Sequence, residues 1–594
     1  MFTAPATWPL AYSSGRRTST TTSPERTIAY AVATSISSAV VTLGHLPRSH
    51  LVPLCRHVPR PERTSPAERA AGGVFGRSQR KTTNRLRWNI EMITSVIDFE
   101  SRRWHRRCLA SHRDHPARPS ELGYAAGQRS FSGSPGCREG SAIQDMSVTP
   151  GSADQPLSRF PAHGLPAGEL RDRLRAKSSG DVDWRSGRIW SLVYSTASEH
   201  DDVVHEAYQQ FASENLLGPT AFPSLATMEK EVVWMLLDLL GADPGTAGGT
   251  MTSGGTESIV LAVKAYRDRA RVQRPEITAP EMVVPVTAHP AFLKAADLLG
   301  VRAVPVPVDH TYGADPAAFA AAMSRSTILG CASAPCFPYG VVDPVEELAD
   351  IAARRDVGLH IDATIGGFAL PFVRELGYQV PAFDFSVPGV TSIAADMHKY
   401  GYGPKGSSTI LYRDRGLRRY QFAAYTDWPG GILASPTLLG TRPGGAIAGA
   451  WAAIVYEGRE GYRRIFSTVM QATQRLRDGI ASIPQLNVIG DPPMSVLAVG
   501  SDEVDMMTVA DRLETRKWRI DRQRDPDSIH LIVNPTHVPV IDEFVDDLRW
   551  ATHDAPPAGS ADNGATLYGV TSRLEAGADV EVAVLDQLES RYDS

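Results

Sequence analysis

The chain has 594 residues, which is too long for one hydrophobic core and long enough for two or three domains. Its formal net charge is -5 at pH 7, so nucleic acid is not an expected partner. The five cysteines show no metal-ligand spacing, and Cys331 and Cys336 lie on or beside an apolar run. We therefore expect a cytoplasmic protein without a metal site.

The first 145 residues form a leader that differs in composition from the rest. They contain about twenty arginines, the single lysine Lys81 and about half as many acidic residues, which predicts disorder. Three interpretations are open: a targeting peptide, a membrane anchor at Thr27–Leu46, or translated upstream sequence ahead of a start at Met146. Because Thr27–Leu46 is diluted by Thr and Ser, we favour the last interpretation and do not expect membrane association.

A glycine-rich segment, Thr252–Ser258, precedes apolar residues at helical spacing over Ile259–Arg271. At a helix start, free backbone N–H groups and the positive end of the helix dipole attract anions, and Gly254 and Gly255 would let a phosphate approach closely. The Gly-Lys-Ser/Thr sequence of a Walker loop is absent. An ordinary loop with a helix N-cap is the alternative.

Short apolar runs alternate with helical patterns through the middle of the chain. This alternation predicts an α/β fold with a mostly parallel sheet covered by helices on both faces, followed by a smaller α/β carboxy-terminal domain. We expect an amino-terminal segment at 146–245, a large domain at 246–448 and a small domain at 449–594. The predicted strands are Met282–Thr287, Arg302–Val308, Thr327–Ala334, Leu359–Ala363, Ser392–Asp396 and Ser408–Arg413, with further strands near Val496 and at Ile529–Val533, and helices at Ala291–Leu299, Val345–Arg355 and Gln471–Ile483.

The predicted strand Leu359–Ala363 carries a carboxylate, Asp362, near its end. Open α/β sheets bind ligands at the carboxyl ends of their strands. A buried acid is costly there unless a cation pairs with it, and a protonated pyridine nitrogen would be such a cation. The alternative is that Asp362 only caps the following turn.

The segment Ser392–Tyr402 ends an apolar strand with Lys399, which is flanked by His398 and aromatic residues. A lysine in partly apolar surroundings loses some preference for its charged form and can attack an aldehyde as a Schiff-base nucleophile. A surface lysine that caps a strand is the alternative for this motif alone. A phosphate loop, Asp362 and Lys399, in that chain order, together indicate a pyridoxal 5'-phosphate (PLP) site.

Four segments resemble the sphingosine-1-phosphate lyase family, which belongs to the fold-type I PLP-dependent enzymes together with the amino-acid decarboxylases. The resemblance extends from about Asp183 to beyond Tyr568, and the lysine motif is more specific than the glycine-rich loop. The similar segments are Thr252–Asp268, Phe337–Pro344, Gly389–Gly406 and Thr426–Gly445.

The resemblance implies a role for each candidate site residue. Lys399 would form the Schiff base with PLP and then move protons, Asp362 would pair with the pyridine nitrogen, and His289 would stack on the ring. The large domain would therefore bind the cofactor, and the family is expected to form a homodimer with shared active sites. The residues that would hold the cofactor phosphate are Gly255, Thr256 and His398, with Thr441 from a second subunit. The expected catalytic residues are Lys399, Tyr194, His289 and Asp362.

The resemblance also implies that Tyr194, Asn215 and Lys405 bind the phosphate head group of a sphingoid base. At a fourth position of this set, the chain has Gly218 where the family has histidine. Gly218 cannot donate a charge-assisted hydrogen bond, and such bonds contribute about 1.5–3 kcal/mol. Leu433 replaces an aromatic residue common in the family, so the natural substrate and its chain length stay open.

The function implied by the resemblance is that of a PLP-dependent carbon–carbon lyase, an aldehyde-lyase. It would cleave a phosphorylated sphingoid base by a retro-aldol reaction into a long-chain aldehyde and phosphoethanolamine, with segment 146–245 contributing to the substrate site and the dimer. An amino-acid decarboxylase on the same fold is the first alternative, with Lys405 as partner of the substrate carboxylate. A PLP-binding protein without turnover is the second, and the presence of Lys399, Asp362 and His289 argues against it.

Overall fold

The computed structural model describes residues 160–559 and, beyond them, 565–566, 573–574, 584–585, 588–590 and 592. The leader at 1–145, its candidate anchor Thr27–Leu46 and the expected start at Met146 lie outside these residues. Within the described part of the chain, no helix is both long enough and apolar enough to cross a membrane.

The central sheet has seven strands in the order β1-β7-β6-β5-β4-β2-β3. Strands β2 to β6 are parallel to one another, whereas β7 is antiparallel to both of its neighbours, β6 and β1. The predicted α/β class with a mostly parallel sheet is therefore confirmed. The strands are β1 Gly248–Thr252, β2 Glu281–Pro285, β3 Arg302–Val306, β4 Thr327–Ser333, β5 Gly358–Asp362, β6 Val390–Asp396 and β7 Ser408–Tyr412.

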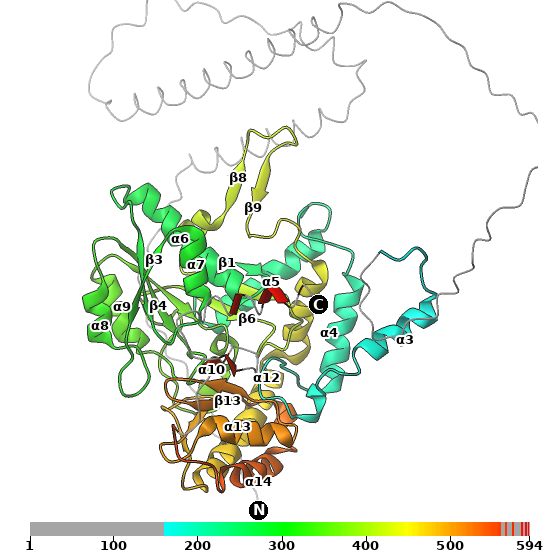
Figure 1. Ribbon diagram of the computed structural model, residues 1–594. Coiled ribbons are helices and arrows are strands. Elements are labelled where there is room, and N and C mark those ends of the chain that lie inside the picture. The colour runs from blue at the N-terminus through cyan, green and yellow to red at the C-terminus, as the bar shows by residue number, and fades with distance from the viewer. Residues whose placement is uncertain are drawn as a thin grey trace, which may run out of the picture. The chain divides into compact units, whose positions relative to one another are not determined.

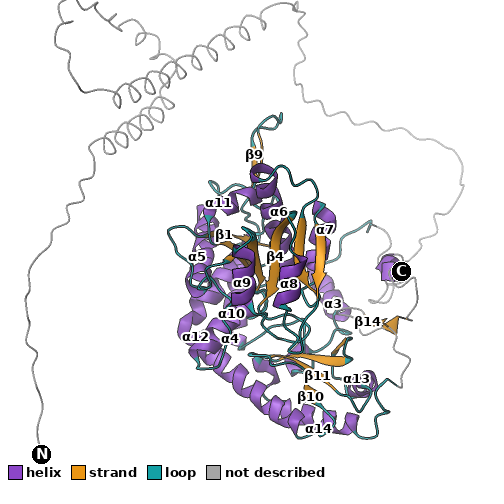
Figure 2. Cartoon of the chain, turned by 90° about the vertical axis from the view of Figure 1, so that its left-hand side faces the viewer, coloured by secondary structure: helices purple, strands orange, loops and turns teal. Residues whose placement is uncertain are grey.

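Helices cover both faces of this sheet (Figure 1, Figure 2). Side chains of α6 and α7 form one core with the first face, and side chains of α8, α9 and α10 belong to the core on the second. Because strand side chains alternate, Leu359 and Ile361 of β5 point into the second core, and His360 and Asp362 point toward α6 and α7. The helices are α6 Gly255–Gln273, α7 Ala291–Leu299, α8 Pro316–Ala322, α9 Val345–Ala353 and α10 Gly366–Glu375.

A separate carboxy-terminal core is built around a four-stranded antiparallel sheet with the order β10-β11-β13-β12. Trp190 of the amino-terminal segment is buried in this core and stacks on His537, with ring centroids 4.2 Å apart. The amino-terminal segment is thus tied to the carboxy-terminal part of the chain. The elements are β10 Asn487–Val488, β11 Val496–Gly500, α13 Met506–Thr515, β12 Asp521–Gln523, β13 Ser528–Ile532 and α14 Ile541–Thr552.

The long helix α12, Gly444–Ala481, contributes side chains both to a core of the central sheet and to the carboxy-terminal core. It packs against α4 (Ser198–Gln210) and α5 (Pro223–Leu239) on one side and α14 on the other. Gly458, with φ 57° and ψ -177°, interrupts it in a conformation that only glycine adopts readily. The predicted helix Gln471–Ile483 is only its last part, and the expected boundary at residue 449, which stays a prediction, falls inside it.

Among the elements that the sequence analysis did not name, two lie close to the candidate site residues in the chain. One is the edge strand β1, whose two glycines weaken the strand signal. The other is a hairpin of β8 (Ala423–Tyr425) and β9 (Leu433–Ser435), which projects away from the central sheet (Figure 1). Helices α3 (Ala167–Lys177) and α11 (Arg415–Arg418) complete the helices between residues 160 and 559.

Candidate active site

Lys399 lies in the loop 397–407, whose two ends are held together because Asp396 of β6 pairs with Ser408 of β7. Hydrogen bonds brace the loop from within: the N–H of His398 donates to the Ser407 carbonyl at 3.1 Å, and that of Gly403 to the Met397 carbonyl at 2.9 Å. The Nζ atom of Lys399 donates to Oγ1 of Thr364 at 3.1 Å and lies 3.0 Å from Oδ2 of Asp396. The lysine nitrogen is therefore fixed at the carboxyl ends of β5 and β6.

Asp362 ends β5, and its buried carboxylate accepts a hydrogen bond from the backbone N–H of Thr364 at 3.1 Å. His289, between β2 and α7, accepts the N–H of Ala291 at Nδ1, so its neutral ring carries the proton at Nε2. Burial lowers the pKa of His289, and the negative charge of Asp362 opposes this shift. A neutral imidazole near Asp362 and Lys399 suits the predicted stacking on an aromatic ring.

The start of α6 lies against the lysine loop. A Cβ atom on Gly255 would lie 2.8 Å from Cγ2 of Thr364, and one on Gly254 would lie 3.6 Å from Cε1 of His398. The Nδ1 atom of His398 is buried and has no hydrogen-bond partner among the described residues. Thr256, which follows Gly255 at the start of α6, is exposed. Backbone N–H groups, the helix dipole and the imidazole nitrogen thus meet at Gly254, where an added Cβ atom would have only His398 within 4 Å, and this arrangement fits a phosphate group.

Glu257, which follows in the first turn of α6, is a buried carboxylate that the sequence analysis missed. It accepts hydrogen bonds from the backbone N–H of Ser253 at 2.6 Å and from the Ser253 hydroxyl at 2.7 Å. Its other oxygen accepts the backbone N–H of Leu438 at 2.8 Å. The only sequence signal was a glutamate in the first helical turn, where it can accept from backbone groups ahead of the helix.

Lys405 and Tyr194 meet on the other side of the loop. The Lys405 ammonium donates to the carbonyls of Leu192 at 3.0 Å and His398 at 3.3 Å, and its Nζ lies 5.4 Å from the centroid of the Tyr194 ring. Loss of solvation lowers the pKa of Lys405 to about 8, with Lys399 acting in the same direction and Asp396 opposing it. The structure therefore brings two predicted substrate residues to the loop that carries Lys399.

Asn215 and Thr441 lie together but outside the contacts described so far. Asn215 forms an antiparallel bridge with Pro443, and its side-chain oxygen accepts the N–H of Leu217 at 3.2 Å. Thr441 is exposed two residues before this bridge. Their expected roles stay predictions, and the exposure of Thr441 is compatible with contact to a second subunit.

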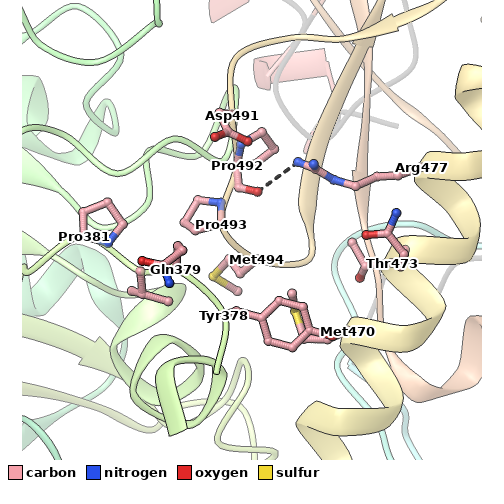
Figure 3. A pocket seen from close by; sticks show the side chains of 12 residues that line it. Tyr378, Gln379, Pro381, Met470, Thr473, Arg477, Asp491, Pro492, Pro493 and Met494 are labelled. Carbon is pink, nitrogen blue, oxygen red and sulfur yellow. Dashed lines mark hydrogen bonds between the residues drawn. The ribbon is translucent and has the colours of Figure 1, made fainter. Parts of the chain in front are cut away.

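Two cavities of similar volume lie in the described part of the chain, one at His289 and one beside α12. One, of about 470 Å³, is lined by His289, by the aromatic residues Tyr312, Phe337 and Tyr339, and on another side by the charged and polar residues Asp521–Asp525. Another, of about 450 Å³, lies between α12 and the segments after α10 and before β11, where Arg477 donates to the carbonyl of Pro492 at 2.9 Å (Figure 3). The second cavity contains no predicted site residue.

This chain is similar in sequence to proteins of known family. A family model described as the pyridoxal-dependent decarboxylase conserved domain matches residues 179–499. A sphingosine-1-phosphate lyase of Arabidopsis thaliana is 41% identical over 442 residues, which cover 73% of this chain and 81% of that protein. This chain belongs to the sphingosine-1-phosphate lyase family. The resemblance inferred from the four segments is thereby confirmed.

Two further proteins are similar to this chain, one of them a sphingosine-1-phosphate lyase and the other a probable decarboxylase. The solved structure of a Burkholderia pseudomallei sphingosine-1-phosphate lyase is 39% identical, with a TM-score of 0.66 over 67% of this chain and 93% of that chain. A probable L-tyrosine/L-aspartate decarboxylase of Methanothermobacter thermautotrophicus is 36% identical, over 60% of this chain and 94% of that protein.

The cofactor of this lyase-family chain is pyridoxal 5'-phosphate. The residues present fit it: the open space at Gly254 and the buried Nδ1 of His398 suit its phosphate, and the buried carboxylate of Asp362 suits a protonated ring nitrogen. Asp362 and Lys399 both lie close enough to His289 for their charges to affect its pKa, in opposite directions. Asp396 and Thr364 contact the lysine directly and had no role in the sequence analysis. Thr364 is 35 residues away in the sequence, and only the fold brings it to Nζ.

Proposed function

We propose that this chain is an aldehyde-lyase that breaks the C2–C3 bond of a phosphorylated sphingoid base and yields a long-chain aldehyde and phosphoethanolamine. One observation carries the proposal: a lysine suited to a Schiff base, Lys399, and a lysine suited to a phosphate, Lys405, share one braced loop. The first would serve the cofactor and the second the substrate head group. Their proximity matches a substrate whose amine and phosphate lie only a few bonds apart.

The protein groups would act on the cofactor and on protons. When bound, PLP supplies an electron sink for the charge left on the substrate carbon as the bond breaks. Asp362 would keep the ring nitrogen protonated, and neutral His289 would cover one face of the ring and exclude water there. Lys399 would hold a proton at Nζ once the substrate amine has taken its place, and would return it to the substrate carbon.

The head group and the alkyl chain would occupy different surroundings. Lys405 would pair with the phosphate, while the hydroxyl of Tyr194 would donate a hydrogen bond to it. The aromatic cavity of about 470 Å³ beside His289 offers apolar surface for the start of the alkyl chain. Gly218 supplies no side chain to the head group, so the phosphate affinity of this chain would be weaker than with a histidine there.

We also propose a homodimer. The hairpin β8–β9 and its loop expose large apolar side chains: Tyr425 is 64% exposed, Trp428 58% and Ile432 76%. A contiguous exposed apolar patch of this kind is typical of an interaction surface. A second copy that covers the hairpin would also approach Asn215 and Thr441, which would give these two residues their expected roles across the interface.

Product analysis tests the proposed reaction. The chain would be incubated with a phosphorylated sphingoid base and, separately, with a panel of amino acids, and the products would be identified by mass spectrometry with Lys399→Ala as the blank. A long-chain aldehyde with phosphoethanolamine supports the lyase. Carbon dioxide from an amino acid would instead support a decarboxylase, the activity that the Methanothermobacter relative suggests.

A second experiment tests the covalent link. Borohydride reduction of the cofactor-loaded protein followed by peptide mapping should find the modified residue at Lys399. A yellow protein whose absorbance does not change with any amine offered would support cofactor binding without turnover, and an unmodified Lys399 would contradict the site itself.

A further inference from the structure

Asp396 closes β6 directly before the loop of Lys399, and it takes no part in the chemistry described above. Its side chain is only 2% exposed. Oδ2 lies 3.0 Å from Nζ of Lys399 and 3.5 Å from Nε2 of His398. A carboxylate so deeply buried is costly unless cationic groups pair with it. The position therefore favours a positively charged Lys399 nearby.

The two carboxylates near Lys399 have different surroundings. Asp362 accepts the N–H of Thr364 and is proposed to hold the pyridine nitrogen of the cofactor. Asp396 is in ion-pair contact with the lysine itself. The titratable or charged groups around the lysine nitrogen, together with the Thr364 hydroxyl, are Asp396 from β6, Asp362 from β5, His289 from the segment before α7, and His398 and Lys405 from the same loop.

The start of α6 holds the carboxylate of Asp396 from the other side. A Cβ atom on Gly255 would lie 3.1 Å from each of its two oxygens, so Asp396 fits only against a glycine. Its Oδ1 is buried and has no hydrogen-bond partner among the described residues. The positive end of the α6 dipole lies on this side and favours the ionised carboxylate.

We propose that Asp396 is a positioning residue that acts as the counter-ion of Lys399 whenever the lysine amine is not covalently bound. The proposal rests on the proposed role of Lys399. The ammonium must lose one proton before the neutral amine can attack an aldehyde carbon, and the Schiff base then forms with release of one water. A carboxylate at 3.0 Å favours the ammonium. Asp396 would therefore keep a proton on Nζ during the part of the cycle in which Lys399 returns it to the substrate.

The pH dependence of lysine reactivity tests the counter-ion role without any sphingoid substrate. The full-length apoprotein would be treated with pyridoxal at a series of pH values and reduced with borohydride, and modified Lys399 would be quantified by peptide mass spectrometry. We expect Asp396→Asn to lower the pH of half-maximal modification by about one unit or more, and to raise the yield at pH 7 several-fold.

Two controls separate charge from packing. Thr364→Val removes the hydrogen bond from Nζ to the threonine hydroxyl but keeps the carboxylate, so the pH of half-maximal modification should stay within about 0.3 units of that of the unaltered chain. In Asp396→Ala, added formate can enter the space left by the side chain and should move the profile back toward that of the unaltered chain. An Asp396→Asn profile that superimposes on the unaltered one would overturn the proposal.

Thermal unfolding of the apoprotein gives a second measurement. Lys399→Met should lower the Tm because it removes the lysine charge that lies 3.0 Å from Asp396 and leaves His398 beside the carboxylate, and adding Asp396→Asn should recover part of that loss. Because the double variant lacks both charges, it should fold even if Asp396→Asn alone does not. A Tm of the double variant no higher than that of Lys399→Met would contradict the pairing. Since neither measurement uses sphingoid substrate, a negative result would leave the lyase proposal standing.

Discussion

Glu257 accepts the backbone N–H of Leu438 at 2.8 Å, although 181 residues separate the two along the chain. The same carboxylate accepts two hydrogen bonds from Ser253, directly before the glycines of the phosphate loop. One buried side chain therefore ties this loop to the segment that leads to Thr441. The shape of the proposed phosphate site would therefore depend on Glu257, to which no contact with the phosphate is assigned.

We predict that Glu257→Ala weakens PLP binding by about tenfold or more. A backbone N–H that loses its acceptor typically costs about 1–3 kcal/mol, and 1.4 kcal/mol corresponds to a factor of ten. The Kd would be measured by titrating the apoprotein with PLP and following absorbance. Glu257→Gln keeps one accepting oxygen, so its Kd for PLP should lie between those of the unaltered chain and of Glu257→Ala. Equal affinity of the alanine variant and the unaltered chain would show that these hydrogen bonds do not shape the site.

Lys405 should make substrate affinity depend on pH. Its pKa of about 8 means that the ammonium is present below pH 8 and is lost as the pH rises through that value. A phosphate monoester gains its second charge near pH 6, so affinity should be highest between about pH 6 and pH 8 and fall above that range. KM for a phosphorylated sphingoid base, measured from pH 6 to pH 9.5, reports the effect.

Two substitutions sharpen this pH experiment. Lys405→Arg stays charged over the whole range and should lose the rise in KM above pH 8, whereas Lys405→Met should bind weakly at every pH. If the arginine variant shows the same rise in KM as the unaltered chain, another group controls phosphate binding.

Gly218→His should improve substrate affinity. A Cβ atom on Gly218 would have Ala221 as its nearest neighbour, at an ordinary contact distance of 3.8 Å, so a side chain can be accommodated. A charged hydrogen bond of about 1.5–3 kcal/mol would lower KM by roughly ten- to a hundredfold. Gly218→Leu, which adds comparable bulk without a donor, is the control. The same KM in the histidine and leucine variants would place the phosphate elsewhere.

The hairpin β8–β9 should hold two copies of the chain together. Replacing both Trp428 and Ile432 by aspartate should halve the mass measured by light scattering after gel filtration, because two charges would have to be buried at the interface. Val272→Asp, at an equally exposed apolar position near the end of α6, should leave the mass unchanged. A dimer that survives the double substitution would exclude the hairpin as its main contact.

The sequence predicted the central strands well because each is a short apolar run between turn residues. The six strands predicted from Met282 to Arg413 end within two residues of the observed ones. Strand β1 was missed because its Gly-Gly start gives little strand signal, and the first half of α12 because its Gly- and Ala-rich residues show little amphipathic contrast. The antiparallel placement of β7 depends on pairing between strands, which a single apolar run does not encode.

The candidate site divides in the same way. Lys399 and Asp362 could be found because each follows an apolar strand at its carboxyl end. The contacts of Thr364 with Lys399 and of Glu257 with Leu438 could not be predicted, because the partners are far apart in the sequence and only the folded chain brings them together. Asp396 lies three residues before Lys399, but the sequence alone does not show that its side chain turns back toward the lysine nitrogen. The roles of Asn215 and Thr441 concern a second subunit, so the structure of one chain leaves them as predictions.

The loop 397–407 is held as one rigid unit between β6 and β7. Strand pairing at Asp396 and Ser408 fixes both of its ends, and internal hydrogen bonds set its shape. Because residues alternate between the two faces of a strand, a slip of one residue in this pairing would carry Asp396 to the opposite face and displace the amine and head-group lysines at once. An exchange at position 405, by contrast, leaves the strand pairing in place. If Lys405 binds the head group as proposed, head-group preference could then change while the reactive nitrogen keeps its position.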